Sequence, residues 1–436
     1  MRTLFVVFLS LVLGVGVRGQ VSYELLAPTP EPLSNNAVAG VEVDGKWFLY
    51  SFSGIDSTKE YTGIHAKVFR YDMEADSWSQ LADLPGNQPR VAAGASTING
   101  KIYVLGGYEV FANGSEVSID SLHIFDPVTN SYEEYALPIP RSIDDHVQLV
   151  YKDSLLYSVT GWSNNGNVRD VWIYDTYLKT WTEGTDIPFT AAFRAFGASG
   201  TIVGDTIYYI GGAISFGDFP ASDFFRKGYI NPFNPAEITW SKEESDNAIS
   251  YRSGASSFDG KPFWLGGSLR TYNYDGIAYS DNTGVDATSR IVHYEPVNGG
   301  LYERFEDFPE IMDLRGLIKI GANEFVSIGG MKENQTVTDR VVKYTFEDLV
   351  DNKEFILERE ILIKPTVNIG TFAVQVNTNR IGERFQIMDA QGRIVYQSSF
   401  KSTEEIIQLD LGNGIYFLNV DSNYTEFVTK KFVVAR

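Results

Sequence analysis

Five arginines recur along this chain, and their side chains suggest the first chemistry to consider. They are Arg90, Arg141, Arg194, Arg252 and Arg315. A guanidinium group is planar and permanently charged, and its N–H donors match the oxygens of carboxylates and sulfates. In a chain with a formal net charge of −20, several guanidiniums meeting at one place would create a local positive potential. We therefore predict an anion-binding mouth formed by these arginines. The alternative is that each arginine pairs with a carbonyl or an aspartate of a neighbouring repeat.

One segment brings carboxylates and an imidazole together. Asp144, Asp145 and His146 are consecutive and follow Arg141, which makes them the best candidates for acid–base catalysis. The four histidines lack the spacing of metal ligands, there is no cysteine, and no nucleophile or phosphate-binding motif is present. The sequence therefore predicts no metal site and no cofactor.

Two polar segments are rich in aromatic residues. One contains Phe216, Phe219, Phe224 and Phe225, and the other contains Tyr272, Tyr274 and Tyr279. Exposed rings beside polar groups suit stacking against the faces of sugars, although such rings can also pack a loop on itself. We count Tyr272 and Tyr274 among the candidate ligand-binding residues.

A repeat determines how these residues are positioned. Short apolar stretches end in a pair of residues containing one or two glycines, with a period of about 50 residues. The pairs are Ser53-Gly54, Gly106-Gly107, Thr160-Gly161, Gly211-Gly212, Gly266-Gly267 and Gly329-Gly330. Turn sequences such as Asp44-Gly45 and Asn99-Gly100 precede them and predict tight hairpins. The composition, 43% apolar and 14% aromatic, also suits many short strands.

Each glycine pair is followed by a strand that ends in an aromatic residue, with a second aromatic further on. The aromatic pairs are Tyr71 and Trp78, Phe125 and Tyr132, Tyr174 and Trp181, Tyr229 and Trp240, and Tyr294 and Tyr302. From about Val21 to Leu349 the sequence resembles the kelch-repeat family. This resemblance implies a six-bladed β-propeller over residues 20–350, in which the glycines and aromatic pairs are scaffold. Since four antiparallel strands return the chain to one face twice per blade, the arginines and the aromatic loops are expected on the same face.

The last repeat lacks an outer strand after Tyr344. Residues Ser22 to Ala27 look like the end of a blade with no blade before it, so we predict that they complete the sixth blade. This closure would remove exposed strand edges. The competing candidate for the outer strand is Glu354 to Glu360.

The N-terminus and the overall charge limit where the protein acts. Residues 1–19 contain Arg2, an apolar run and small residues before Gln20, which is typical of a cleaved signal peptide. No later apolar run is long enough to predict a membrane span. The acidic net charge disfavours nucleic acid and anionic membranes as partners.

After an expected linker at residues 351–362, the pattern changes over residues 363–436. The ordered motifs are Asp389-Ala390-Gln391-Gly392-Arg393-Ile394-Val395, Gly414-Ile415-Tyr416 and Lys430-Lys431. This region resembles the type A C-terminal sorting domain of the type IX secretion system, except that the family's Pro-Asn-Pro opening is replaced by Lys364-Pro365-Thr366-Val367-Asn368. The resemblance implies a small β-sandwich, the type IX machinery as partner, and a protein that is secreted or held at the outer cell surface after removal of the tail.

Three functions fit these observations. The first is a binding protein that recognises an extracellular (acidic) carbohydrate or a protein ligand on its loop face. The second is a sugar-acid mutarotase resembling N-acetylneuraminate epimerase, although its catalytic residues cannot be matched one by one. The third is a purely structural adhesin. The fold alone does not choose among them.

Overall fold

The protein is described by a computed structural model over residues 21–296, 299–347, 361–365, 367–376, 381–422 and 426–435. It divides into two compact units, Met1–Leu349 and Val350–Arg436. The predicted signal peptide at residues 1–19, most of the expected linker and the competing strand Glu354 to Glu360 lie outside the described residues.

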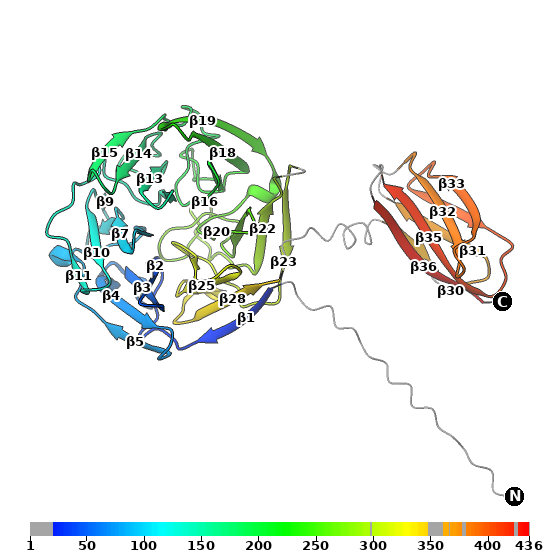
Figure 1. The fold of residues 1–436 in the computed structure, drawn as a ribbon, viewed down its shortest axis with the longest axis horizontal. Coiled ribbons are helices and arrows are strands. Elements are labelled where there is room, and N and C mark those ends of the chain that lie inside the picture. The colour runs from blue at the N-terminus through cyan, green and yellow to red at the C-terminus, as the bar shows by residue number, and fades with distance from the viewer. Residues whose placement is uncertain are drawn as a thin grey trace, which may run out of the picture. The chain divides into compact units, whose positions relative to one another are not determined.

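The first unit is a ring of six four-stranded antiparallel sheets, which we call blades 1 to 6 (Figure 1). From the innermost strand outward, blade 1 contains β2 (Ala37–Val43), β3 (Lys46–Ile55), β4 (Ile64–Asp72) and β5 (Ser77–Gln80). Blade 2 contains β6 (Gly94–Ile98), β7 (Lys101–Leu105), β10 (Leu122–Asp126) and β11 (Ser131–Tyr132). Blade 3 contains β12 (Val147–Tyr151), β13 (Leu155–Val159), β14 (Val171–Asp175) and β15 (Thr180–Glu183).

The remaining blades repeat this order. Blade 4 contains β16 (Ser199–Val203), β17 (Thr206–Ile210), β18 (Phe224–Asn231) and β19 (Asn234–Glu244). Blade 5 contains β20 (Gly254–Phe258), β21 (Lys261–Leu265), β22 (Arg290–Tyr294) and β23 (Leu301–Phe305). Blade 6 contains β24 (Ile318–Lys319), β25 (Glu324–Ile328), β28 (Val341–Phe346) and β1 (Val21–Leu26). The predicted six-bladed propeller is confirmed.

The hydrophobic core lies between the faces of adjacent blades. Between blades 3 and 4, for example, Tyr157 and Ile173 pack in one buried cluster with Ile207 and Tyr209. A blade with apolar residues on both faces must bury each face against a neighbour, so the sheets stack around a closed ring.

The N-terminal strand closes this ring. β1 pairs with β28 in antiparallel register from Val21 opposite Phe346 to Leu26 opposite Val341. The backbone just after β1 also contacts blade 1, because Trp78 Nε1 donates to the carbonyl of Ala27 at 2.9 Å. The prediction that Ser22 to Ala27 complete the sixth blade is therefore confirmed.

Three of the five predicted aromatic pairs are cross-strand neighbours, and two are not. Tyr71 with Trp78, Phe125 with Tyr132, and Tyr174 with Trp181 each have ring centroids 5.1 Å apart. In blade 4 the register places Trp240 opposite Gly228, leaving Tyr229 exposed. In blade 5, Tyr302 lies opposite His293 instead of Tyr294. In these two blades the strand register differs from that of the other blades, so the two aromatics are not directly opposite each other.

Short additional elements decorate the blade ends. They are the hairpins β8 (Tyr108–Val110) with β9 (Glu116–Ser118) and β26 (Met331–Lys332) with β27 (Thr336–Val337), and the 3-10 turns Tyr61–Gly63, Pro85–Asn87, Asp246–Ala248 and Glu333–Gln335. Among the described residues no helix is long and apolar enough to cross a membrane.

The second unit consists of two sheets with a common apolar core. One sheet contains β29 (Ile361–Lys364), β31 (Thr371–Val376) and β34 (Glu404–Gln408), and the other contains β30 (Val367–Asn368), β36 (Glu426–Val434), β35 (Gly414–Ser422), β32 (Arg384–Asp389) and β33 (Ile394–Ser399). Phe372 and Val374 from the first sheet pack with Phe385, Leu418 and Phe432 from the second. β32 and β33 form a hairpin whose turn contains Ala390, Gln391 and Gly392.

Candidate ligand-binding pocket on the loop face

Six residues, one before each inner strand, form a ring at one end of the propeller axis. This central ring consists of Asn35, Ala92, Asp145, Gly197, Arg252 and Asp313, and all six have positive φ. Backbone hydrogen bonds link neighbours in the ring, from Asp145 N to the carbonyl of Ala92 (3.1 Å), from Gly197 N to that of Asp145 (2.9 Å), and from Arg252 N to that of Gly197 (2.9 Å). The ring therefore fixes where its side chains can point.

The glycine pairs hold this ring in place from the neighbouring blade. Gly107 donates its N–H to Ile143, Gly212 to Ser250, and Gly330 to Leu33, in each case just before the next blade's ring residue. A Cβ atom on Gly211 would lie 1.9 Å from the Ser250 carbonyl oxygen, so only glycine allows this approach. The same residues that predicted the repeat thus position the candidate site.

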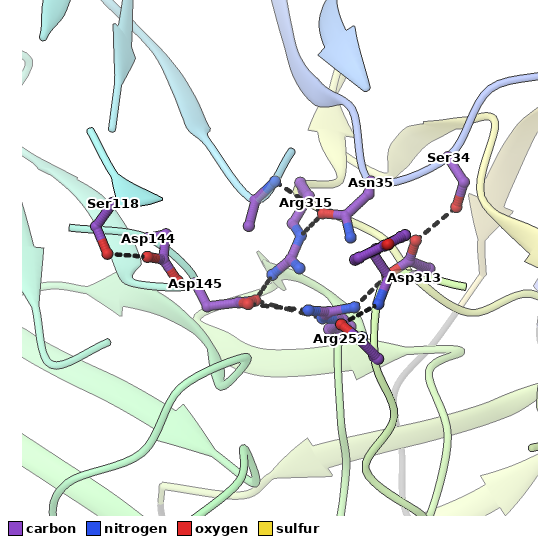
Figure 2. Close-up of polar contacts among 11 residues, drawn as sticks. Ser34, Asn35, Ser118, Asp144, Asp145, Arg252, Asp313 and Arg315 are labelled. Atoms are coloured by element: carbon purple, nitrogen blue, oxygen red, sulfur yellow. Dashed lines mark hydrogen bonds and ion pairs between the residues drawn. The ribbon is translucent and has the colours of Figure 1, made fainter. Parts of the chain in front are cut away.

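Four charged side chains occupy the centre of the ring. We call Asp145, Arg252, Asp313 and Arg315 the central ion cluster. Arg252 binds Asp145 through Nη2–Oδ2 at 2.9 Å and Asp313 through Nη1–Oδ1 at 3.1 Å, and Arg315 Nη1 contacts Asp145 Oδ1 (Figure 2). Arg315 Nε also donates to Asn35 Oδ1 at 2.7 Å, and Ser34 Oγ donates to Asp313 Oδ2 at 2.6 Å.

The central ion cluster is internally neutral and closed to solvent. Its side chains are between 0% and 8% exposed, and two guanidiniums balance two carboxylates. Burial alone would raise the pKa of Asp145, but Arg252 and Arg315 outweigh it and hold this pKa below its usual value. Both guanidiniums are therefore already committed to protein carboxylates.

A pocket of about 300 Å³ opens beside the cluster, among the loops that follow the glycine pairs. We call it the loop-face pocket. Its lining residues come from blades 2 to 5 and are Tyr108, Gly114, Glu116, Asp144, Asp145, Trp162, Phe196, Phe219, Asn273 and Tyr279. The volume is at the lower end of the range of small-molecule sites.

Aromatic rings form one side of this pocket. Trp162 lies 5.4 Å from Phe196 and 5.7 Å from Phe219 between ring centroids, and Phe219 lies 5.2 Å from Tyr279. All three contacts are edge-to-face, which is a favourable geometry for aromatic pairs. Because the rings support one another across loops of blades 3, 4 and 5, the pocket wall is preformed.

Carboxyl groups form the polar side. Ser118 Oγ donates to Asp144 Oδ2 at 2.5 Å, and the Asp144 side chain is almost fully buried. Burial and the neighbouring carboxylate of Asp145 raise the pKa of Asp144 well above its usual value. Partial desolvation also raises the pKa of Glu116, although Arg252 opposes this shift. No arginine, lysine or histidine lines the pocket among the described residues.

The predicted acid–base group of Asp144, Asp145 and His146 is divided among three environments. Asp144 lines the loop-face pocket, Asp145 serves mainly the central ion cluster, and His146 lines the central channel. The positive φ of Asp145 turns the chain between its neighbours. Burial lowers the pKa of His146 to about 4, and its Nε2 lies 3.1 Å from Gln148 Oε1. The structure therefore does not bring the imidazole to the two carboxylates.

The five predicted arginines also separate. Only Arg252 and Arg315 meet, and Asp145 lies between them. Arg90 is buried and donates to the Gly106 carbonyl at 3.2 Å and to Ser121 Oγ at 2.8 Å. The exposed Arg141 pairs with Asp170 at 2.8 Å, and the Arg194 guanidinium lies 4.2 Å from the centroid of Phe189. The five arginines therefore do not converge on an anion-binding mouth. Arg252 and Arg315 instead pair with aspartates, as in the alternative interpretation of the sequence.

The predicted aromatic residues divide in the same way. Phe219 and Tyr279 line the loop-face pocket, whereas Tyr272 is fully buried beneath Arg252, with the guanidinium 5.2 Å from its ring centroid. Tyr274 packs beside a buried cluster that contains Ile55 and Val91. Neither Tyr272 nor Tyr274 is among the lining residues of the pocket.

A second cavity of about 380 Å³ follows the inner strands along the central channel. Its lining includes His146, Gln148, Arg315 and Lys319, and it borders the central ion cluster through Arg315. In the described part of the chain no group of three or more histidine, cysteine, aspartate or glutamate residues could hold a metal ion.

Several pocket residues were not singled out from the sequence. Glu116 belongs to the small hairpin β8–β9, and Tyr108 and Trp162 each follow a glycine pair directly. The position directly after a glycine pair could have identified Tyr108 and Trp162 from the sequence, because the family fold brings these loops to one face. Phe196 and Asp313 lie at or next to the ring position of their blades, which is defined only by the tertiary structure.

Comparisons with known proteins agree with this architecture. Residues 24–212 match the KLHDC2/KLHL20/DRC7 kelch-repeats domain, and residues 365–435 match the secretion system C-terminal sorting domain. The solved structure of YjhT superposes with a TM-score of 0.58 at 18% identity, covering 74% of this chain and 98% of that one, which supports the fold alone.

Curated relatives match parts of the propeller. N-acetylneuraminate epimerase of Escherichia coli O139:H28 is 26% identical over 200 residues, which are 44% of this chain and 47% of the epimerase. Kelch-like protein 36 of Rattus norvegicus is 27% identical over 214 residues, covering 49% of this chain and 32% of that protein. Alpha-scruin of Limulus polyphemus is 30% identical over 113 residues, covering 25% of this chain and 12% of scruin. This chain therefore spans less than half the length of each of these relatives.

One matched region lies within each of the two units described above. The sorting domain indicates the type IX secretion machinery as partner and transport to the cell surface. The chain therefore combines a six-bladed propeller that contains a kelch-repeat region with a C-terminal sorting domain of the type IX secretion system.

Proposed function

We propose that this protein is an extracellular binding protein whose loop-face pocket takes a carbohydrate. The observation that carries the proposal is the composition of that pocket, which is lined both by the rings of Trp162, Phe219 and Tyr279 and by the acidic residues Glu116 and Asp144. Sugar rings offer C–H faces that stack on aromatic side chains, and hydroxyl groups that donate to carboxyl oxygens.

The proposal does not extend to an acidic sugar in this pocket. Of the five arginines that suggested an anionic ligand, Arg252 and Arg315 are bound to Asp145 and Asp313, and none lines the pocket, whose described charged residues are all acidic. A carboxylate on the ligand would find no basic partner in the described pocket lining.

Binding would be tested with a glycan array and the mature protein. We expect a defined group of glycans to bind, and the variants Trp162→Ala and Asp144→Asn to lose that signal. Arg141→Ala is the matched control, because the Arg141 side chain is exposed and does not line the pocket. Retention of the array pattern in both pocket variants would refute the assignment of the pocket.

A second candidate function is sugar mutarotation. It is favoured by the partial similarity to N-acetylneuraminate epimerase and by two carboxyl groups, Glu116 and Asp144, whose raised pKa values suit proton transfer. Anomer exchange of any bound sugar, followed by NMR, distinguishes the two functions. A catalyst would accelerate the exchange and lose this activity in Asp144→Asn, whereas a binding protein would leave the exchange rate unchanged.

A further inference from the structure

Only one of the three acidic residues that line the loop-face pocket has basic partners among the described residues of the protein. Asp145 is paired with Arg252 and Arg315, so its charge is cancelled inside the protein. No basic partner contacts the side chain of Glu116 or Asp144 within the described chain. The pocket therefore presents two carboxyl groups that have no counter-charge of their own.

Asp144 is the more informative of the two. Its side chain is 3% exposed, yet it lines the pocket. Ser118 occupies Oδ2, and no described residue donates a hydrogen bond to Oδ1. Oδ1 is therefore open to the pocket, and a ligand group that supplies both a hydrogen-bond donor and a positive charge would form the strongest bond to it.

The aromatic wall favours the same kind of group. Trp162, Phe196, Phe219 and Tyr279 form a set of edge-to-face contacts and line the same pocket as these carboxyls. Cations are attracted to the faces of aromatic rings, most strongly to tryptophan, and this attraction increases when water is excluded. A neutral hydroxyl group would form hydrogen bonds with the carboxyl oxygens but would have no charge to attract them.

We propose that the ligand of the loop-face pocket carries an ammonium group, which binds Asp144 and Glu116 against the aromatic wall. An amino sugar is the class of ligand that satisfies both this inference and the proposed carbohydrate function, on which the inference rests. Its hydroxyls would bind Asn273 and the remaining carboxyl oxygens, and its amine would supply the missing counter-charge.

The alternative is that Asp144 is structural and only holds Ser118 and the β8–β9 hairpin in place. In that case Asp144→Asn would change stability without changing the preference between charged and neutral ligands. The two roles therefore separate on ligand selectivity.

The test uses matched probe pairs and calorimetry on the mature protein. D-glucosamine is compared with D-glucose, and choline with its neutral isostere 3,3-dimethylbutan-1-ol. We expect the charged member of each pair to bind at least about tenfold more tightly, which corresponds to about 1.4 kcal/mol. Asp144→Asn and Glu116→Gln should each reduce this preference severalfold, while Asp170→Asn, a carboxylate outside the pocket, should not change it.

The pH dependence adds an independent readout. The charged groups that act on Asp144 are Asp145, Glu116 and Arg315, and Arg252 acts on Glu116. Because both carboxyls must be ionised to attract a cation and both have raised pKa values, choline affinity should increase with pH, and binding should release protons. Calorimetry in two buffers of different ionisation enthalpy measures that release.

Each outcome decides a different point. Equal affinity within both pairs would overturn the ammonium inference and leave the carbohydrate proposal standing. Binding of choline without either sugar would support the ammonium site and overturn the carbohydrate proposal. Failure of all four probes to bind would overturn both.

Discussion

Arg252 and Asp145, 107 residues apart in the chain, meet at the propeller axis in a two-point ion pair. Nη2 lies 2.9 Å from Oδ2 and Nε lies 3.3 Å from Oδ1, and both side chains are almost fully buried. The contact joins blade 3 to blade 5 across the ring, while Asp313 and Arg315 join blade 6 to the same cluster. The cluster therefore ties together blades that are not neighbours.

Replacing Arg252 tests this structural role. We expect Arg252→Ala to lower the free energy of unfolding by about 3–5 kcal/mol, because Asp145 and Asp313 would each lose a buried partner. Arg141→Ala should cost less, about 1 kcal/mol, since the Arg141 side chain is 53% exposed in its ion pair with Asp170. Urea unfolding of both variants measures the difference, and equal stabilities would contradict the role given to the cluster.

Gly197 tests the packing of the central ring. A Cβ atom there would lie 2.4 Å from Cε2 of Tyr251, whereas a Cβ on Gly204, at a similar positive φ, would meet nothing within 4 Å. Ala92 occupies an equivalent ring position, so the backbone conformation itself tolerates a side chain.

We therefore expect Gly197→Ala to destabilise the propeller by about 1–3 kcal/mol more than Gly204→Ala, through overpacking against Tyr251. Thermal and urea unfolding of the two variants isolate the steric contribution. Indistinguishable midpoints would mean that Tyr251 moves aside without cost.

The buried histidines predict that the folded protein loses stability as the pH falls. Burial lowers the pKa values of His65, His123, His146 and His293 to about 4. An unfolded histidine titrates near pH 6.5, so between about pH 6.5 and 4 the unfolded chain binds protons that the folded protein does not. Stability should fall across this window by up to about 1.4 kcal/mol per pH unit for each histidine.

His293→Phe tests this explanation at one site. Neither ring nitrogen of His293 has a hydrogen-bond partner among the described residues, and the ring stacks on Tyr302, so a phenyl ring suits the position. We expect a small effect at pH 8 and a relative stabilisation of about 2 kcal/mol at pH 5. Wild-type and variant stability curves that run parallel across pH would show that His293 does not titrate as described.

Removing residues 363–436 tests the sorting domain. The truncated protein should accumulate in the periplasm, because the propeller would lack the signal for the outer-membrane machinery. Cell fractionation measures this, and the full-length chain in the same strain is the control. Surface display of the truncated protein at the normal level would contradict the sorting role.

The sequence by itself determined the architecture. The glycine pairs recur because the chain must approach the next blade's carbonyls there, as Gly211 approaches Ser250, and this local requirement is visible without coordinates. The closing strand at Ser22 to Ala27 was also predictable, because an edge strand with no partner must find one. The cross-strand neighbour of Trp240 could not be predicted in this way. Trp240 lies opposite Gly228 instead of Tyr229, because a shift in strand register changes which residues face each other.

Only the tertiary structure decided the site. The five arginines recur with the repeat, but they lie at different offsets from the ring residue of their blade, so Arg252 and Arg315 point to the axis while Arg141 points to solvent. The loop-face pocket combines Glu116, Asp144, Trp162, Phe219 and Tyr279, which belong to loops of four blades and share no sequence motif. Side-chain direction depends on backbone dihedrals and register within each blade, and these are set by contacts between blades that the order of residues does not reveal.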